Sequence, residues 1–262
     1  MSLTLADTAA LARSFFDAAR TPKVHPRPSH EMTLSVDEAY GVQAAQVALM
    51  EQAGESVVAI KLGLTDQHQR DAQNWNAPSF GSLTNAMVVG EGDDFSVTGS
   101  LQPRVEPEIV VVLGSDITES PRLDELPAHI RSIHVGIEIV DPRFDDQAFI
   151  LTDALCDNAA ARSGVWAKRG VSPYDVDLSD VTATLSIDGD VVLTGAGSAL
   201  MGNPLLLVKE IIDERLRLGF PVFEGLAIFT GNLAGKAYPV TAGQSVVVSA
   251  GALGDITLQI VA

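Results

Sequence analysis

Cysteine and basic residues are scarce in this chain. Cys156 is the single cysteine among 262 residues, so the chain can form no internal disulfide and a reducing compartment is expected. The 17 lysines and arginines are outnumbered by 34 aspartates and glutamates, which gives a formal net charge of −17. Such an acidic surface repels phosphate backbones and anionic lipids, so we expect neither a nucleic-acid nor a membrane partner. A small anionic substrate is still compatible with this charge, because a buried cation can dominate the field inside a cleft.

Several patterns that mark common sites and targeting signals are also missing. The apolar runs are far shorter than a membrane span, and the first residues lack the basic-then-apolar pattern of a signal peptide. The five histidines are scattered, and no Cys/His spacing typical of zinc sites occurs. The glycines of 195–197 lack the strand-then-helix setting of a dinucleotide site. We therefore expect a cytoplasmic protein.

Helical and β patterns follow one another along the chain. Apolar residues recur at helical spacing between Leu5 and Phe16, and Ser35 with Glu38 has the form of a capping box that opens a second helix. Asn203 is expected to start a further helix, and the Asp-Gly pair at 188–189 forms a hairpin turn. Strands are predicted at 57–62, 95–97, 105–113, 134–140, 181–187, 191–194, 226–229, 245–249 and 256–261. The pattern predicts an α+β protein with a helical region at 1–75 and a β-rich domain at 76–262.

Three glutamates in two apolar stretches are the main candidates for a functional site. Glu106 and Glu108 lie two residues apart in the β-branched run 104–113, so on a strand they point to the same face. Glu138 has apolar neighbours on both sides, and burying a carboxylate there is costly without a partner. A divalent cation that prefers oxygen ligands, such as Mg²⁺ or Mn²⁺, would suit all three and leave positions open for a substrate. The alternative is that Glu106 and Glu108 form only the solvated face of a half-exposed sheet.

Short motifs spread from about residue 35 to the C-terminal end resemble one known family. They are KLGLT at 61–65, QPRVEPE at 102–108, EIVDPR at 138–143, DNA at 157–159, GAG at 195–197 with GNP at 202–204, and TG at 230–231. In this order they resemble the 2-keto-4-pentenoate hydratases of the fumarylacetoacetate hydrolase superfamily, and the 4-oxalocrotonate decarboxylases share them. The resemblance implies a mixed β-roll with a helical N-terminal region.

The resemblance also implies an active site and a reaction. It places Mg²⁺ or Mn²⁺ on Glu106, Glu108 and Glu138 and a catalytic proton shuttle on Lys61. A lysine beside a divalent cation should lose its proton more easily. It implies a small 2-oxo acid as the substrate, in the catabolism of aromatic compounds. The remaining site residues expected on this basis are Ser79 as a catalytic residue and, as substrate-binding residues, Leu64, Arg162 and Thr230.

Three departures from the family pattern leave the reaction open. Ser79 stands where the hydratases carry an aspartate and the decarboxylases an apolar residue, Ala160 and Ala161 stand where serines are usual, and 232–236 replaces a short apolar run. Hydration is the first expectation and 4-oxalocrotonate-type decarboxylation the alternative. An acylpyruvate-type hydrolase using His30 and Glu31, or a non-catalytic metal-binding partner subunit, is expected less. We also expect a homo-oligomer, with a sister hydratase or decarboxylase as a possible partner in a complex.

Overall fold

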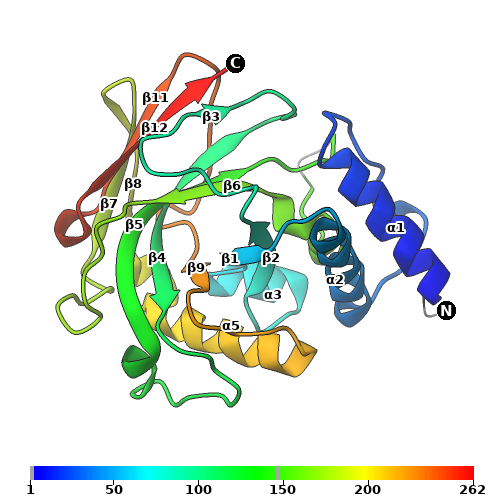
Figure 1. The fold of residues 1–262 in the computed structure, drawn as a ribbon, viewed down its shortest axis with the longest axis horizontal. Helices are drawn as coiled ribbons and strands as arrows, with labels where there is room; N and C mark the ends of the chain where they lie inside the picture. The colour runs from blue at the N-terminus through cyan, green and yellow to red at the C-terminus, as the bar shows by residue number, and fades with distance from the viewer. Residues whose placement is uncertain (1–2, 146–147) are drawn as a thin grey trace.

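Two curled β-sheets with helices at one side make up the protein (Figure 1). The computed structural model describes residues 3–145 and 148–262. The first sheet has the strand order β2 (Ser79–Thr84), β1 (Val57–Gly63), β9 (Ala227–Phe229), β4 (Arg104–Leu113), β5 (Ile130–Val140) and β6 (Ala161–Trp166), and β10 (Tyr238–Pro239) also pairs with β4. The second has the order β3 (Phe95–Ser96), β12 (Asp255–Val261), β11 (Ser245–Ser249), β7 (Thr182–Ile187) and β8 (Asp190–Ala196).

The helices begin and end where local sequence chemistry specifies. Capping boxes start α1 (Leu5–Ala18) at Thr4 and α2 (Val36–Gln52) at Ser35. Helix α5 (Pro204–Leu218) is capped by the Asn203 side chain and ends at Gly219 in the left-handed region, with φ of 78°. Two short helices, α3 (Gln67–Gln73) and α4 (Leu151–Cys156), complete the set in the described residues. None of these described helices is both long and apolar enough to cross a membrane.

The order of the first sheet brings distant parts of the sequence together. Strand β9 lies between β1 and β4, parallel to β1 and antiparallel to β4. The long strands β4 and β5 pair over almost their whole length, and most of their buried residues are apolar. Pro107 lies between the part of β4 that pairs with β10 and the part that pairs with β9, so its missing N–H interrupts no ladder. A continuous core of buried Ile, Leu, Val and Phe side chains connects both sheets and the helices.

Each strand predicted from the sequence occurs, and five of the described α-helices and β-strands were not predicted, one of them the two-residue strand β10. The fold class, a β-rich α+β protein with helices at the N-terminal end, is confirmed. Strands β2 and β6 and helices α3 and α4 were missed, because they are short and rich in Gly, Ser, Ala or polar residues. Strand β1 belongs to the segment 1–75 but pairs with β2 and β9, so that segment contributes a strand to the main sheet. A domain division at residue 75 remains a prediction.

Candidate metal centre and substrate cavity

Strand register places three carboxylates against one another. Glu106 on β4 lies directly opposite Glu138 on β5, and Glu108 follows two residues later on the same face of β4. One carboxylate oxygen from each of the three lies within 4.8 Å of the others. Glu108 and Glu138 are fully buried and Glu106 is half-buried. The reading of Glu106 and Glu108 as a solvated face is therefore wrong.

The hydrogen bonding of this cluster fits a divalent cation. Glu108 accepts a hydrogen bond from the Gly231 N–H at 2.8 Å through one oxygen, while its other oxygen has no partner among the described residues. Neither oxygen of Glu138 has a hydrogen-bond partner there either. Buried carboxylate oxygens are costly when nothing compensates them. Three clustered carboxylates, two of them with oxygens that lack a hydrogen-bond partner among the described residues, are the ligand set that hard cations prefer, so the residues present fit such an ion.

Burial and mutual repulsion shift the pKa values of the carboxyl groups. Burial, followed by the charge of Glu138, raises the pKa of Glu106 to about 7 against the lowering effects of Lys61, Asn232 and Arg104. Burial also raises the pKa of Glu108 well above its ordinary value, followed by the charges of Glu138 and Glu106. A cation among these groups would reverse both effects by stabilising the ionised forms.

Lys61 is the cation that the protein itself supplies to the cluster. It lies on β1 with only 6% of its surface exposed, and its Nζ is 3.0 Å from Oε1 of Glu138. This contact is an ion pair, because its geometry does not satisfy a hydrogen bond to that oxygen. Burial lowers the pKa of Lys61, but the charges of Glu138, Glu106 and Glu108 outweigh burial and the net pKa is raised. The ammonium form is therefore the stable one beside the three carboxylates.

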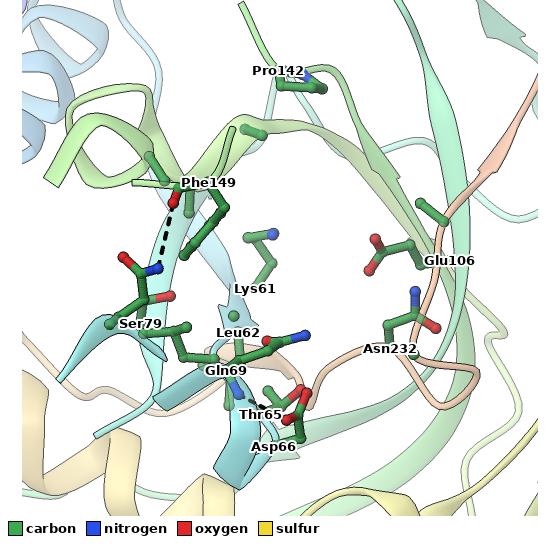
Figure 2. A pocket seen from close by; sticks show the side chains of 18 of the residues that line it. Lys61, Leu62, Thr65, Asp66, Gln69, Ser79, Glu106, Pro142, Phe149 and Asn232 are labelled. Carbon is green, nitrogen blue, oxygen red and sulfur yellow. Dashed lines mark hydrogen bonds between the residues drawn. The ribbon is translucent and has the colours of Figure 1, made fainter. Parts of the chain in front are cut away.

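A cavity of about 680 Å³ opens in front of this cluster. Figure 2 shows Lys61 between two sides of the cavity, with Glu106 and Asn232 on one side and Phe149 and Ser79 on the other. Glu108 and Glu138 are not in its lining and lie behind Glu106 and Lys61 in the sheet. The site thus has a charged end built on the sheet and open space beyond it.

An unusual backbone turn forms part of the cavity wall. Asn158, Ala159 and Ala160 all have left-handed φ angles, of 50°, 52° and 57°. Arg143 holds this turn through its Nη1, which donates to Asp157 Oδ1 at 3.0 Å, and Asn158 bonds both the N–H and the carbonyl of Ser82. Non-glycine residues in this region cost about 1–2 kcal/mol each. The buried hydrogen bonds stabilise a turn that the local sequence alone would not favour.

Comparison with known proteins identifies the family. The family described as "Fumarylacetoacetate (FAA) hydrolase C-terminal" matches residues 40–261. The chain belongs to the fumarylacetoacetate hydrolase family. The 2-keto-4-pentenoate hydratase of Burkholderia vietnamiensis strain G4 is 34% identical to it over 88% of this chain and 87% of its own. The 2-hydroxyhexa-2,4-dienoate hydratase of Comamonas testosteroni is 30% identical over 87% of this chain and 88% of its own.

A solved structure supports the same branch of the fumarylacetoacetate hydrolase family. The 4-oxalocrotonate decarboxylase from Pseudomonas putida G7, complexed with magnesium and adipate, matches with a TM-score of 0.90 over 99% of both chains at 26% identity. The same decarboxylase complexed with calcium and acetate matches with a TM-score of 0.88. The resemblance read from the motifs to the hydratase and decarboxylase branch is confirmed.

The predicted site residues of this family member fall into two groups in the structure. Lys61, Leu64, Ser79 and Glu106 line the cavity, with Glu108 and Glu138 behind them. Thr230 does not line it, because its side chain is fully buried and donates to the Ile109 carbonyl at 3.1 Å.

Arg162 and the His30–Glu31 pair lie elsewhere. Arg162 lines a separate cavity of about 160 Å³, where it donates to Ser100 Oγ and the Thr98 carbonyl, each at 3.1 Å. Neither Arg162 nor Thr230 lines the large cavity, and their assignment as substrate-binding residues stays a prediction. His30 and Glu31 are exposed and do not line the large cavity.

Sequence reasoning missed several residues of the cavity. Asn232 lies beside Glu106 in Figure 2, and Arg27, Phe144 and Phe149 line the wall. The only sequence signal for Asn232 was its place in a segment that departs from the family pattern. Nothing in the sequence indicated Arg27, which lies in a proline-rich loop far from the other lining residues.

Proposed function

We propose that this protein is a metal-dependent lyase that hydrates a 2-hydroxy-dienoate, through its 2-oxo-enoic acid tautomer, in the catabolism of aromatic compounds. The observation that carries the proposal is the buried cluster of Glu106, Glu108 and Glu138 with Lys61 at the end of a ligand-sized cavity. The three glutamates would hold Mg²⁺ or Mn²⁺. The identity to named hydratases, at 34% and 30%, supports the same reaction class.

The substrate's oxygen atoms explain why such a cluster suits a 2-oxo acid. When bound, the cation supplies Lewis-acid chemistry to a carboxylate oxygen and a neighbouring keto oxygen that can chelate it together. Glu106 and Asn232 on one side and Ser79 on the other then flank the carbon chain. The sheet holds these side chains in fixed positions, which favours productive orientation.

Lys61 is proposed as the proton shuttle. Ketonisation moves a proton from the 2-hydroxyl group to the far end of the diene, and hydration then adds water across the remaining conjugated double bond. Both steps need a group that gives and takes a proton in the cavity. The Lys61 Nζ faces the cavity, and neutralising the carboxylates beside it would remove the interactions that raise its pKa.

The water step has two contributors in this proposal. Ser79 offers a hydroxyl group that can orient water where the hydratases carry an aspartate. Among the described acids of the cavity lining, Asp157 is bound to Arg143 and Asp66 caps α3 through a hydrogen bond from the Gln69 N–H. Glu106 would hold the cation, and that cation would be the second contributor, because it supplies Lewis-acid chemistry that activates water.

Decarboxylation of a 2-oxo acid of the 4-oxalocrotonate type is the second candidate. Ser79 carries no carboxylate to activate water, and the structural match to the decarboxylase is close at a TM-score of 0.90. Incubation with Mg²⁺ or Mn²⁺ and a panel of 2-hydroxy-dienoates and 2-oxo diacids separates the two. Loss of dienol absorbance without CO₂ supports hydration, CO₂ release supports decarboxylation, and neither with any substrate would refute both.

Assembly and location complete the proposal. We infer a homo-oligomer, with association with a sister hydratase or decarboxylase as a further possibility of this branch, in the cytoplasm. Strands β3 and β8 lie at the two ends of the second sheet, so each has an edge that another copy could cover. Light scattering at micromolar concentration should give at least the mass of a dimer, and a monomer mass would contradict it.

A further inference from the structure

The cavity is far larger than the smallest substrate of the proposed reaction. Its volume of about 680 Å³ lies in the middle of the range of roughly 300–1,000 Å³ that holds drug-sized ligands. The same volume would hold on the order of 20 water molecules at about 30 Å³ each. A five-carbon dienoate held at the charged end would leave much of this space unfilled. The unfilled part must suit some other portion of the true ligand.

The side of the cavity away from Glu106 contains a large apolar group beside the Ser79 hydroxyl. Phe149 lies there, across from Glu106 and Asn232 in Figure 2, with 52% of its surface exposed. Phe144 and two small residues, Ala154 of α4 and Ala160 of the left-handed turn, line the cavity as well. Covering a large exposed aromatic ring at a cavity wall with an apolar ligand group favours binding, because it removes apolar surface from water.

The charges around the cavity do not favour a second carboxylate on that side. The cations in its described lining are Lys61, Arg27 and Lys236. Arg27 is already engaged, by Asp153 at 3.3 Å, the Ala148 carbonyl at 2.6 Å and the Phe144 ring at 4.3 Å. Lys236 belongs to the turn that begins at Asn232, on the side of the cavity where Glu106 lies. A diacid reaching the Phe149 side would place its far carboxylate against apolar groups.

We propose that the preferred substrate is a monocarboxylic 2-hydroxy-dienoate, or its 2-oxo tautomer, whose far end carries an apolar alkyl or aryl group larger than methyl. This group packs against Phe149 and the wall formed by Ala154 and Ala160, while the 2-oxo acid end lies at the glutamate cluster. The inference rests on the proposed function and adds the chemical class of the substrate's tail. It also favours monoacids over the diacids of the decarboxylase reaction.

Binding can be measured without turnover. The Mg²⁺-loaded protein is titrated by calorimetry with the saturated acids 2-oxopentanoate, 2-oxohexanoate and 2-oxooctanoate and with the diacid 2-oxoadipate. Affinity should rise about three- to fourfold for each added methylene, the factor expected for burying one methylene group. The diacid should bind more weakly than 2-oxohexanoate. In parallel, kcat/KM is compared for 2-hydroxypenta-2,4-dienoate and its 5-alkyl and 5-phenyl relatives.

Two variants test the wall itself. Phe149→Ala should reduce the ratio of 2-oxooctanoate to 2-oxopentanoate affinity at least threefold, and Ala154→Leu should reduce it by occupying the space. Tyr174→Ala is the matched control, because this aromatic residue is 73% exposed and does not line the cavity. The control should keep the wild-type ratio.

The outcomes separate this inference from the proposed function. Turnover of the five-carbon dienoate with affinities that do not change with chain length would overturn the inference alone. Tighter binding of the diacid than of 2-oxohexanoate would overturn it too. If no 2-oxo acid binds and no dienoate is consumed, the proposed function falls and this inference with it.

Discussion

Replacing Glu138 by glutamine should weaken the binding of divalent cations and reduce the stabilisation that they give the folded protein. Glu138 is fully buried and lies opposite Glu106, and neither of its oxygens has a hydrogen-bond partner among the described residues. Glutamine keeps the size of the side chain but removes its charge. In the variant the cation would lose one of its three charged ligands, and the amide nitrogen would point a donor at the site.

The size of the effect follows from ligand-linked stability. A cation at 100 times its dissociation constant stabilises the folded protein by about 2.7 kcal/mol. At roughly 2–4 °C per kcal/mol for a chain of this size, the melting temperature should rise by about 5–10 °C. We take the replacement of Glu138 to weaken cation binding about 100-fold, the upper end of the range for residues that only support a metal ligand. The same cation concentration then stabilises the folded protein by only about 0.4 kcal/mol. The rise in melting temperature then shrinks to about 1 °C.

Differential scanning calorimetry with EDTA and with excess Mg²⁺ measures this shift. Each variant is compared only with itself, because the substitution also removes the ion-pair partner of Lys61 and changes the baseline stability. Glu224→Gln is the matched control. Glu224 is exposed, forms an ion pair with Arg131 and does not belong to the buried glutamate cluster. It should keep the full Mg²⁺-induced rise. A full rise in Glu138→Gln would show that this residue does not bind the cation.

Three further predictions address the proton shuttle, the reaction branch and pH. Lys61→Met should lower turnover by about 10²–10⁴-fold, the usual loss on removing an acid–base group, while calorimetry still shows a Mg²⁺-induced rise; unchanged turnover would move the shuttle elsewhere. Ser79→Asp should raise the rate of hydration of 2-hydroxypenta-2,4-dienoate about tenfold, because it introduces a carboxylate. The new side chain has room, because the neighbouring Gly63 has no Cβ. A fall in CO₂ release from 2-oxo diacids with no gain in hydration would instead indicate a decarboxylase. Burial lowers the pKa of His25 in the folded protein, so the unfolded chain binds the proton more readily and stability is lost as pH falls below about 6.5. Urea unfolding in EDTA at pH 7 and pH 5 should therefore show a smaller pH-dependent loss for His25→Gln than for wild type, and equal losses would contradict this cause.

Local chemistry explains which elements the sequence could predict. The capping box at Ser35 and the amide of Asn203 fix helix starts through short-range hydrogen bonds that the sequence displays directly. The two-residue period of a strand was enough to place Glu106 and Glu108 on one face. By contrast, β6 contains a single β-branched residue, Val165, and forms because it pairs with β5. Such a strand depends on tertiary context more than on its own composition.

The site was predictable only in part for the same reason. That Glu138 would meet Glu106 depended on the register of β4 and β5, which no local pattern reveals. Residues transferred from the family pattern carried no information on side-chain direction, so Thr230 turned out to bond a backbone carbonyl. Arg162 lines the smaller cavity and not the large one. Asn232 and Phe149 come from loops, whose paths are set by the rest of the fold.

The position of β9 has a consequence for the order in which the protein folds during synthesis. This strand of three residues is inserted between β1, which carries Lys61, and β4, which carries two of the glutamates. The N–H of Gly231 that holds Glu108 comes just after it. During synthesis, the lysine and the carboxylates therefore cannot take up their final spacing until more than four-fifths of the chain has left the ribosome. Nascent chains and fragments that end before residue 227 should contain Glu106, Glu108 and Glu138 and yet lack their final arrangement around Lys61.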